Sequence, residues 1–287
     1  MAFDRRSVLG VLAGASAAAP LLLAQGRAQA AATPLTPEQA NLAATEAHAQ
    51  LMSVPDLHMH GGETVSMLIY PGFTALDLIG PHHFLASMMG ARVELVTNQP
   101  NLEPVKSDLG LAFTPDATLN SAMENPTVLF APGGAAGTVA AMERAETLDY
   151  LRDRGGRAKL VTSVCTGALL LAAAGLLKGR RATTHWAAHD VLADFGAIPV
   201  DARVVRDGHV ITGAGVSAGL DFGLSFVEQL RGRPYAQALM LQAEYAPQPP
   251  FPGGTVANTD PRIAKALEGM LSPVIAHARR IALAGRT

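Results

Sequence analysis

The sequence predicts an α/β fold in which a mostly parallel sheet is covered by helices on both faces. Three short apolar runs, at residues 65–70, 127–131 and 159–164, lack the polar alternation of half-exposed strands, so we expect strands buried on both faces. Stretches with the apolar spacing of helices separate these runs. Because 49% of the 287 residues are hydrophobic and 16% are charged, the chain can also fill a large core.

The individual elements follow from the same patterns, in chain order from residue 64. Expected strands are residues 65–70, 92–97, 127–131, 159–164 and 182–184. Expected helices are residues 74–89, a stretch that ends near 155, a stretch that begins at 166, and residues 217–230, 235–245 and 260–284. Residues 104–116 indicate an antiparallel excursion, and Asp207-Gly208 between two apolar runs is a strong hairpin signal.

The first thirty residues differ in composition from the rest. They contain Arg5-Arg6, a moderately apolar stretch and the small-residue motif Ala28-Gln29-Ala30, which together are typical of a twin-arginine export signal. A membrane anchor is the alternative, although the apolar stretch is short and weak for a span. We expect cleavage after residue 30, a periplasmic location and no stable membrane insertion.

Composition changes also divide the remainder of the chain. Residues 31–63 mix Pro, Ala, Gln and Glu with short helical periodicity at most, and a Pro/Gly-rich stretch begins at Pro247. The expected organisation is a signal at residues 1–30, a lead-in segment at 31–63, an α/β domain at 64–246, and a linker with a final helix at 247–287.

Charge and cysteine content exclude several classes of function. The net charge is −2 at pH 7 and the sequence shows no basic stripe, which argues against nucleic acid as a partner. The single cysteine, Cys165, cannot form an internal disulfide, so in an exported protein its thiol is either hidden or kept for reactivity.

The position of Cys165 favours reactivity. It lies between the apolar strand at residues 159–164 and a helix start of small residues at Thr166. A thiol at a sharp strand-to-helix turn projects from the sheet edge, and the positive end of the helix dipole would lower its pKa toward the thiolate. The alternative is a small hydrophobic residue of the core.

Asp77 is a carboxylate in an apolar helix start that follows the first strand. Its neighbours Leu76, Leu78 and Ile79 argue for burial. A buried carboxylate needs either a partner or a raised pKa, so Asp77 becomes a candidate general acid or base. The alternative is a residue that caps the helix or interacts with its dipole.

A third loop, Pro132-Gly133-Gly134, reaches the same edge, because ligands of open α/β sheets bind outside the carboxyl ends of the strands. Two glycines let backbone N–H groups approach a ligand, and with the N–H of Thr166 they would form an oxyanion-type pocket. Most turns of this composition are only turns.

The histidines are weaker candidates. His185 follows the strand next to the nucleophile strand, where it either contacts substrate near the thiol or packs as a neighbour. The pairs at residues 58 and 60 and at residues 82 and 83 lack a third ligand at suitable spacing, so no metal site is expected.

The motifs around these residues resemble one known family. They are VTSVCTGALLLAAAGLLKGRRATTHWAAHDVLADFGAIPV, RVVRDGHVITGAGVSAGLDFGLSFVEQL, LIYPGFTALDLIGP, LFAPGG and QAEYAPQPPF. From about residue 65 to 245 the chain closely resembles the isonitrile (isocyanide) hydratases of the PfpI-like branch of the class I glutamine-amidotransferase-like superfamily. The resemblance implies a flavodoxin-like α/β domain, a homodimer, Cys165 as nucleophile and Asp77 as the acid/base facing it. It also implies that Thr166 and Gly134 supply backbone donors.

The function implied is hydration of a small isocyanide to an N-substituted formamide through a thioimidate on the cysteine, without a cofactor. A glyoxalase- or amidase-type enzyme on small carbonyl or amide substrates is one alternative. An exported redox-sensing or ligand-binding protein without turnover is another.

Two related functions are not expected. The intracellular proteases of the family have histidine after the cysteine, where this chain has Thr166. Transcription regulators with a similar elbow end in two helix-turn-helix motifs, and about forty residues after Tyr245 are too few for that module. The export signal is itself a departure from the cytosolic hydratases, so the physiological substrate stays open.

Overall fold

The structure, a computed structural model, describes residues 35–285, so the predicted export signal at residues 1–30 lies outside the described residues. The strands of its central sheet are β1 (Thr64–Ile69), β2 (Arg92–Thr97), β5 (Ala117–Thr118), β6 (Val128–Ala131), β7 (Leu160–Val164), β10 (Val204–Asp207) and β11 (Val210–Gly213). They lie in the order β10-β11-β7-β6-β1-β2-β5, and only β10 and β11 pair antiparallel. The predicted mostly parallel sheet is confirmed, and the β10–β11 pair is the hairpin that Asp207-Gly208 indicated.

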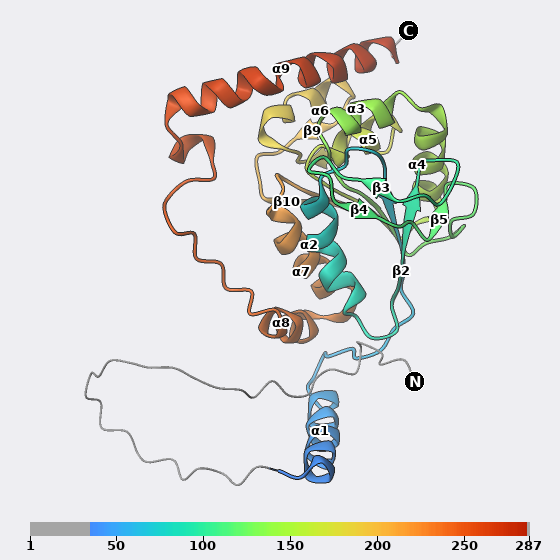
Figure 1. The fold of residues 1–287 in the computed structure, drawn as a ribbon, viewed down its shortest axis with the longest axis vertical. Coiled ribbons are helices and arrows are strands. Elements are labelled where there is room, and N and C mark those ends of the chain that lie inside the picture. The colour runs from blue at the N-terminus through green and yellow to red at the C-terminus, as the bar shows by residue number, and fades with distance from the viewer. Residues whose placement is uncertain (1–34, 286–287) are drawn as a thin grey trace.

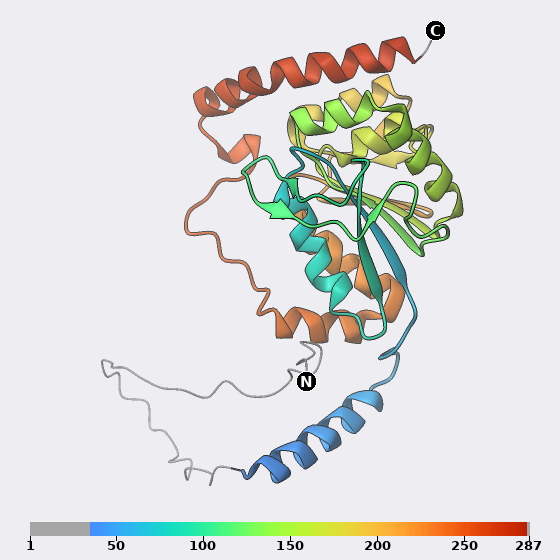
Figure 2. The same cartoon turned by 45° about the vertical axis from the view of Figure 1, so that its right-hand side comes forward.

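Helices cover both faces of the sheet (Figure 1). The α-helices of residues 35–285 are α1 (Pro37–Met52), which lies apart from the sheet, and α2 (Ala75–Ala86), α3 (Ala136–Met142), α4 (Ala145–Arg157), α5 (Gly167–Ala173), α6 (Val191–Asp194), α7 (Ala218–Arg231), α8 (Arg233–Gln242) and α9 (Pro261–Ala284). On one face α2 packs against α7, and on the other α3, α4 and α5 contact one another (Figure 2). This two-sided cover explains why the strands of the sheet centre are apolar along their whole length.

Two small strand pairs lie outside the main sheet. One joins β3 (Val105–Lys106) to β4 (Ala112–Phe113) in antiparallel fashion, as the excursion at residues 104–116 predicted. The other joins β8 (Arg181–Ala182) to β9 (Ile198–Pro199) in parallel. A short 3₁₀ turn, η2 (Trp186–Ala188), follows β8.

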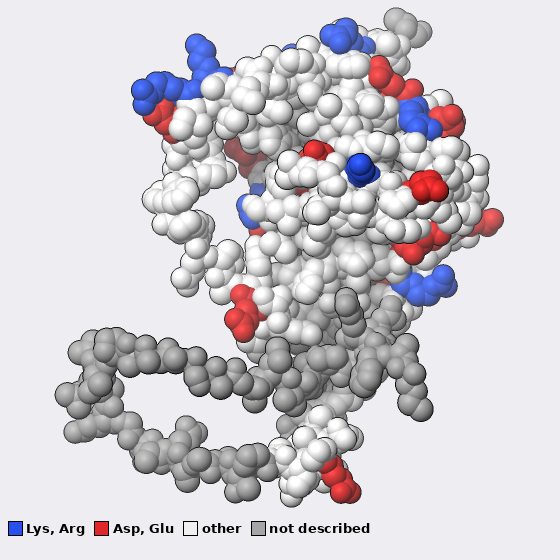
Figure 3. All heavy atoms as spheres, viewed as in Figure 1, with Lys and Arg blue, Asp and Glu red and all other residues white. Residues whose placement is uncertain are grey.

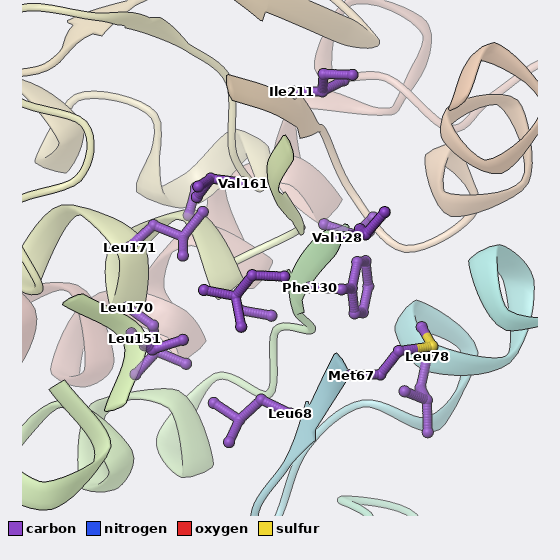
Figure 4. Close-up of a cluster of buried hydrophobic side chains, with 14 of the residues drawn as sticks. Met67, Leu68, Leu78, Val128, Phe130, Leu151, Val161, Leu170, Leu171 and Ile211 are labelled. Atoms are coloured by element: carbon purple, nitrogen blue, oxygen red, sulfur yellow. The ribbon is translucent and has the colours of Figure 1, made fainter. Parts of the chain in front are cut away.

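The core is built from the inward side chains of the sheet and of the helices on its two faces. Nearly every residue of β1, β6 and β7 is buried. Burial of one large apolar side chain contributes about 1.5–3 kcal/mol, so a cluster of this size fixes the strands firmly. Figure 4 shows part of the cluster, with Met67, Leu68, Leu78, Val128, Phe130, Leu151, Val161, Leu170, Leu171 and Ile211 labelled.

The register of the three central strands brings their carboxyl ends level. Ala131 of β6 pairs with Ser163 of β7, and Phe130 of β6 pairs with Met67 of β1. The residues that follow these strands, which are Tyr70, Pro132 and Cys165, therefore emerge at one edge of the sheet. α9 lies across this end of the molecule and contacts α3, α5, α6 and η2 (Figure 1).

The lead-in segment departs from the sequence prediction, because residues 37–52 form the sixteen-residue helix α1 where only short helical periodicity was expected. Local chemistry forms it: the hydroxyl of Thr36 accepts from the backbone N–H of Gln39, and the side chain of Gln39 accepts from the backbone N–H of Thr36. None of its residues is buried. Because the helix has no buried face, its sequence carries no amphipathic pattern from which it could have been predicted.

The end of the lead-in segment is fastened by Arg231, whose side chain is only 1% exposed. Its guanidinium forms an ion pair with Glu63 and donates to the backbone carbonyls of Met59 (2.9 Å) and Met89 (3.0 Å). Because one buried cation satisfies several acceptors far apart in sequence, it holds the start of β1 against α7.

Acidic and basic side chains are scattered over the face seen in Figure 3 rather than gathered in one stripe. Within residues 35–285 no helix is both long enough and apolar enough to cross a membrane.

Candidate active site

Cys165 occupies a tight turn between β7 and α5. Its φ of 57° lies in the left-handed region, which costs a non-glycine residue about 1–2 kcal/mol. Hydrogen bonds hold this conformation: the N–H of Cys165 donates to the carbonyls of Gly213 (3.0 Å) and Ala214 (2.8 Å), and its own carbonyl accepts from Thr184 Oγ1 (2.7 Å). The elbow predicted from the sequence is present, and its strain is maintained by the residues around the end of β11 and by Thr184, which lies in the loop after β8.

Asp77 lies in the first turn of α2 and is completely buried. Its Oδ2 accepts the backbone N–H of Gly133 (2.9 Å), whereas Oδ1 is buried without a hydrogen-bond partner of its own in the described structure. Burial raises the pKa of this carboxyl to about 7, although the N–H of Gly133 and the nearby thiol of Cys165 oppose the rise. The predicted burial is confirmed.

The sequence argument for that burial was only partly correct. Leu78 is buried, but Leu76 and Ile79 are 45% and 42% exposed and lie on the outer face of α2. Asp77 is buried because the Gly133 turn and the cysteine elbow close over it, which are contacts of long sequence separation.

The thiol does not have the lowered pKa that the helix dipole predicted. Burial raises the pKa of Cys165 well above its ordinary value, and the negative charge of Asp77 raises it further, while hydrogen bonds from Thr166 act in the opposite direction. A seven-residue helix cannot outweigh the loss of solvation of a thiolate that is 5% exposed. Cys165 and Asp77 therefore share a buried environment that raises the pKa of both groups.

The glycines after Pro132 serve the side chains of the site. The N–H of Gly133 donates to Asp77, and the N–H of Gly134 donates to Thr166 Oγ1 (3.1 Å). A Cβ at residue 133 would lie 2.6 Å from the backbone nitrogen of Thr166 and 2.7 Å from Oδ2 of Asp77, so only glycine fits there. The sequence predicted that these N–H groups would face a ligand. In the structure the N–H groups of Gly133 and Gly134 instead donate to side chains of the protein.

Three further residues join this site that sequence patterns did not single out. The hydroxyl of Tyr70, at the end of β1, contacts Thr138 of α3, and Thr138 contacts Thr166. Asp108, at the tip of the β3–β4 hairpin, accepts from Thr74 Oγ1 (2.7 Å) and raises the pKa of Asp77. The one available signal was that Tyr70 is the last residue of the expected strand at residues 65–70, whose carboxyl end lies at the same edge of the sheet as the three loops.

His185 is half-buried, and burial lowers its pKa. Its Nδ1 accepts from the N–H of Ala187 (3.4 Å) at the start of η2, and its ring lies 5.5 Å from that of Trp186. Within residues 35–285 no hydrogen bond or ion pair joins it to Cys165 or Asp77. In the same part of the chain no group of three His, Cys, Asp or Glu side chains is placed to hold a metal ion.

Comparison with known proteins places the site in context. The family model described as the DJ-1/PfpI family matches residues 63–229. The chain is 48% identical over 191 residues to an isonitrile hydratase from Pseudomonas putida, a match that covers 67% of this chain and 82% of the relative. It is similar to a crystal structure of a ThiJ/PfpI family protein from Pseudomonas syringae, with 49% identity, a TM-score of 0.77, and coverage of 80% of this chain and 96% of the other.

A more distant solved structure has the same fold. Drosophila melanogaster DJ-1beta is 25% identical, with a TM-score of 0.59, and the match covers 65% of this chain and all of that one. The matched family segment spans every residue of the described site, from Tyr70 to Ala214. The chain therefore belongs to the DJ-1/PfpI family.

Proposed function

We propose that this protein hydrates an isonitrile to an N-substituted formamide, with Cys165 as the nucleophile and Asp77 as the group that carries the protons. The single observation that supports this most is the isolated thiol–carboxyl pair, in which a buried carboxyl group with a pKa of about 7 lies beside a strained cysteine. The likeness to the Pseudomonas putida isonitrile hydratase supports the substrate class.

The pair holds one proton that must move during the first step. As Sγ of Cys165 attacks the terminal carbon of the isonitrile, the thiol proton passes to the carboxylate of Asp77 and then to the same carbon. A C–S bond and a C–H bond form, and the product is a thioimidate, R–N=CH–S–Cys165. A carboxyl group near neutrality suits this step because it must accept a proton and return it.

Water completes the reaction through the same carboxylate. Asp77 takes one proton from water as the oxygen adds to the thioimidate carbon, and it returns that proton to the nitrogen. The C–S bond then breaks as the remaining hydroxyl proton of the adduct passes through Asp77 to the sulfur, and R–NH–CHO leaves. Oδ1 of Asp77, which has no hydrogen-bond partner of its own, is the oxygen open to these transfers.

Gly133 and Gly134 contribute by holding the reacting side chains. Gly133 orients Oδ2 of Asp77, and Gly134 orients the hydroxyl of Thr166. A contact of either N–H or of His185 with substrate stays a prediction. The proposal includes export by the twin-arginine route, a periplasmic location and a homodimer, which rest on the sequence pattern and the family resemblance.

The decisive experiment measures formamide production from a small alkyl or aryl isonitrile by purified protein lacking residues 1–30. Cys165→Ala and Asp77→Asn are each expected to abolish turnover. The matched control is Asp149→Asn, which removes a carboxylate that is 70% exposed on α4 and should leave the rate unchanged. A thioimidate on Cys165 should appear as a mass increase equal to the mass of the isonitrile.

Retained turnover in Cys165→Ala would remove covalent catalysis from the proposal. Turnover of methylglyoxal or of a simple amide, with none of any isonitrile, would favour the carbonyl- or amide-directed alternative. A peroxide-sensitive thiol with no turnover of any of these substrates would favour a sensing protein.

A further inference from the structure

A chain of three buried hydroxyl groups leads to the sulfur from the interior. The Tyr70 hydroxyl lies 2.7 Å from the carbonyl oxygen of Pro132 and 3.0 Å from Oγ1 of Thr138. Oγ1 of Thr138 lies 2.8 Å from Oγ1 of Thr166, which is in turn within reach of the thiol of Cys165. Tyr70 and Thr138 are completely buried and Thr166 is 6% exposed, so bulk water does not satisfy these groups.

The direction of each hydrogen bond in this chain follows from counting hydrogens. A carbonyl oxygen can only accept, so the single hydroxyl hydrogen of Tyr70 points to Pro132. Thr138 must then be the donor in its contact with Tyr70, because Tyr70 has no hydrogen left. By the same logic Thr166 is the donor in its contact with Thr138.

In the resting site the count leaves the neutral thiol without a hydroxyl hydrogen, so the hydroxyl of Thr166 can lower the thiol pKa only by turning to the thiolate. Thr166 has one hydroxyl hydrogen, which Thr138 receives, and its oxygen accepts the N–H of Gly134 (3.1 Å). Tyr70 keeps its hydroxyl hydrogen, and with it the bond to Pro132, since burial raises its pKa well above its ordinary value. The charged or titratable groups that face the sulfur are then Asp77 and Tyr70, and Asp108 acts on both of them.

We propose that Tyr70 and Thr138 are positioning residues that turn the hydroxyl hydrogen of Thr166 away from Sγ of Cys165 in the resting site and yield it to the sulfur when the thiolate forms. Thiolate is formed twice in the proposed reaction, when the thiol attacks and when the C–S bond breaks. The hydroxyl of Thr166 thus donates to the sulfur only when the sulfur is charged. A hydrogen bond stabilises a thiolate more than it stabilises a neutral thiol.

The inference rests on the same site as the proposed function but can be tested without a substrate. Alkylation of the single cysteine by iodoacetamide, followed by intact mass between pH 6 and pH 10, reports how readily the thiolate forms. Thr138→Val removes the competing acceptor, so the hydrogen of Thr166 turns to the sulfur and alkylation at pH 7 should become about three- to tenfold faster. Tyr70→Phe should act in the same direction, because Thr138 is then free to donate to Thr166.

Changes at Thr166 should have the opposite sign. Thr166→Val removes the donor, so alkylation should become slower than in the unaltered protein. Combining it with Thr138→Val should abolish the acceleration, which separates hydrogen-bond direction from simple opening of the site. Thr138→Ser retains the hydroxyl and should restore the original rate.

Matched controls exist elsewhere in the fold. Tyr150→Phe and Thr147→Val alter a buried tyrosine and a buried threonine on α4 and should leave the alkylation rate unchanged.

The proposal is overturned if Thr138→Val is alkylated no faster than the unaltered protein, or if its acceleration persists when Thr166→Val is also present. Should Thr138→Val unfold, Tyr70→Phe makes the same test: it should be alkylated faster than the unaltered protein, and an unchanged rate contradicts the hydroxyl chain. If the protein turns over no isonitrile, the proposed function is refuted. The hydroxyl chain is still tested, because alkylation of Cys165 needs no substrate.

Discussion

Replacing Asp77 by asparagine should stabilise the protein in a strongly pH-dependent way. The pKa of Asp77 rises from 3.8 to about 7 on folding. The folded state therefore binds the proton more tightly than the unfolded chain, and the carboxyl group lowers stability increasingly as pH rises from about 4 to about 7. At 1.36 kcal/mol per pKa unit, the ionisable carboxyl group lowers the free energy of unfolding by about 4 kcal/mol at pH 8 and by about 2 kcal/mol at pH 5.

The assay is urea unfolding of the reduced protein at these two pH values, followed by circular dichroism. Asp77→Asn keeps the shape of the side chain and an acceptor for the N–H of Gly133 but cannot ionise, so its gain in unfolding free energy should roughly halve between pH 8 and pH 5. Asp149→Asn, on the exposed face of α4, should gain nothing at either pH. An equal gain at both pH values, or a loss at pH 8, would refute the assignment of a buried, charge-destabilised carboxyl group.

Three other substitutions test the packing around the site. Gly133→Ala should lower the free energy of unfolding by about 1–3 kcal/mol, since its Cβ would lie 2.6 Å from the backbone nitrogen of Thr166. It should also disturb the thiol–carboxyl pair. Thermal melts would measure the first effect and cysteine alkylation the second. Cys165→Gly should be about 1 kcal/mol more stable than Cys165→Ala, because only glycine adopts a φ of 57° without strain; equal melting temperatures would contradict this. Arg231→Ala should cost about 3–5 kcal/mol in urea unfolding by leaving Glu63 unpaired, whereas Arg233→Ala, from an exposed ion pair, should cost less than about 1 kcal/mol.

The strand-to-helix elbow and the hairpin were predictable because their signals are local. An apolar run followed by Cys165-Thr166 and small residues specifies a turn into a helix, and Asp207-Gly208 specifies a tight connection between strands. The helix at residues 37–52 was missed for the complementary reason. Its capping interactions are also local, but it has no buried face to produce a periodic apolar pattern.

The properties of the reacting groups were only partly predictable. Asp77 was expected to be buried by its sequence neighbours, yet Leu76 and Ile79 face outward and the Gly133 turn encloses the carboxyl group instead. The thiol pKa was expected to fall through the helix dipole, whereas burial and the charge of Asp77 raise it. A pKa depends on every group that surrounds the atom, and most of those groups are distant in the chain.

The sequence by itself determined the buried central strands, most of the helices that pack on them, and the three loops that carry Asp77, Gly133 and Cys165. Periodicity, turn chemistry and composition act over a few residues and are written directly in the chain. Only the tertiary structure decided that a tyrosine directly after β1 and a threonine of α3 meet beside the sulfur in one chain of hydroxyl groups. Strand register and close packing place these groups to within about an ångström, and local sequence patterns do not specify positions that finely.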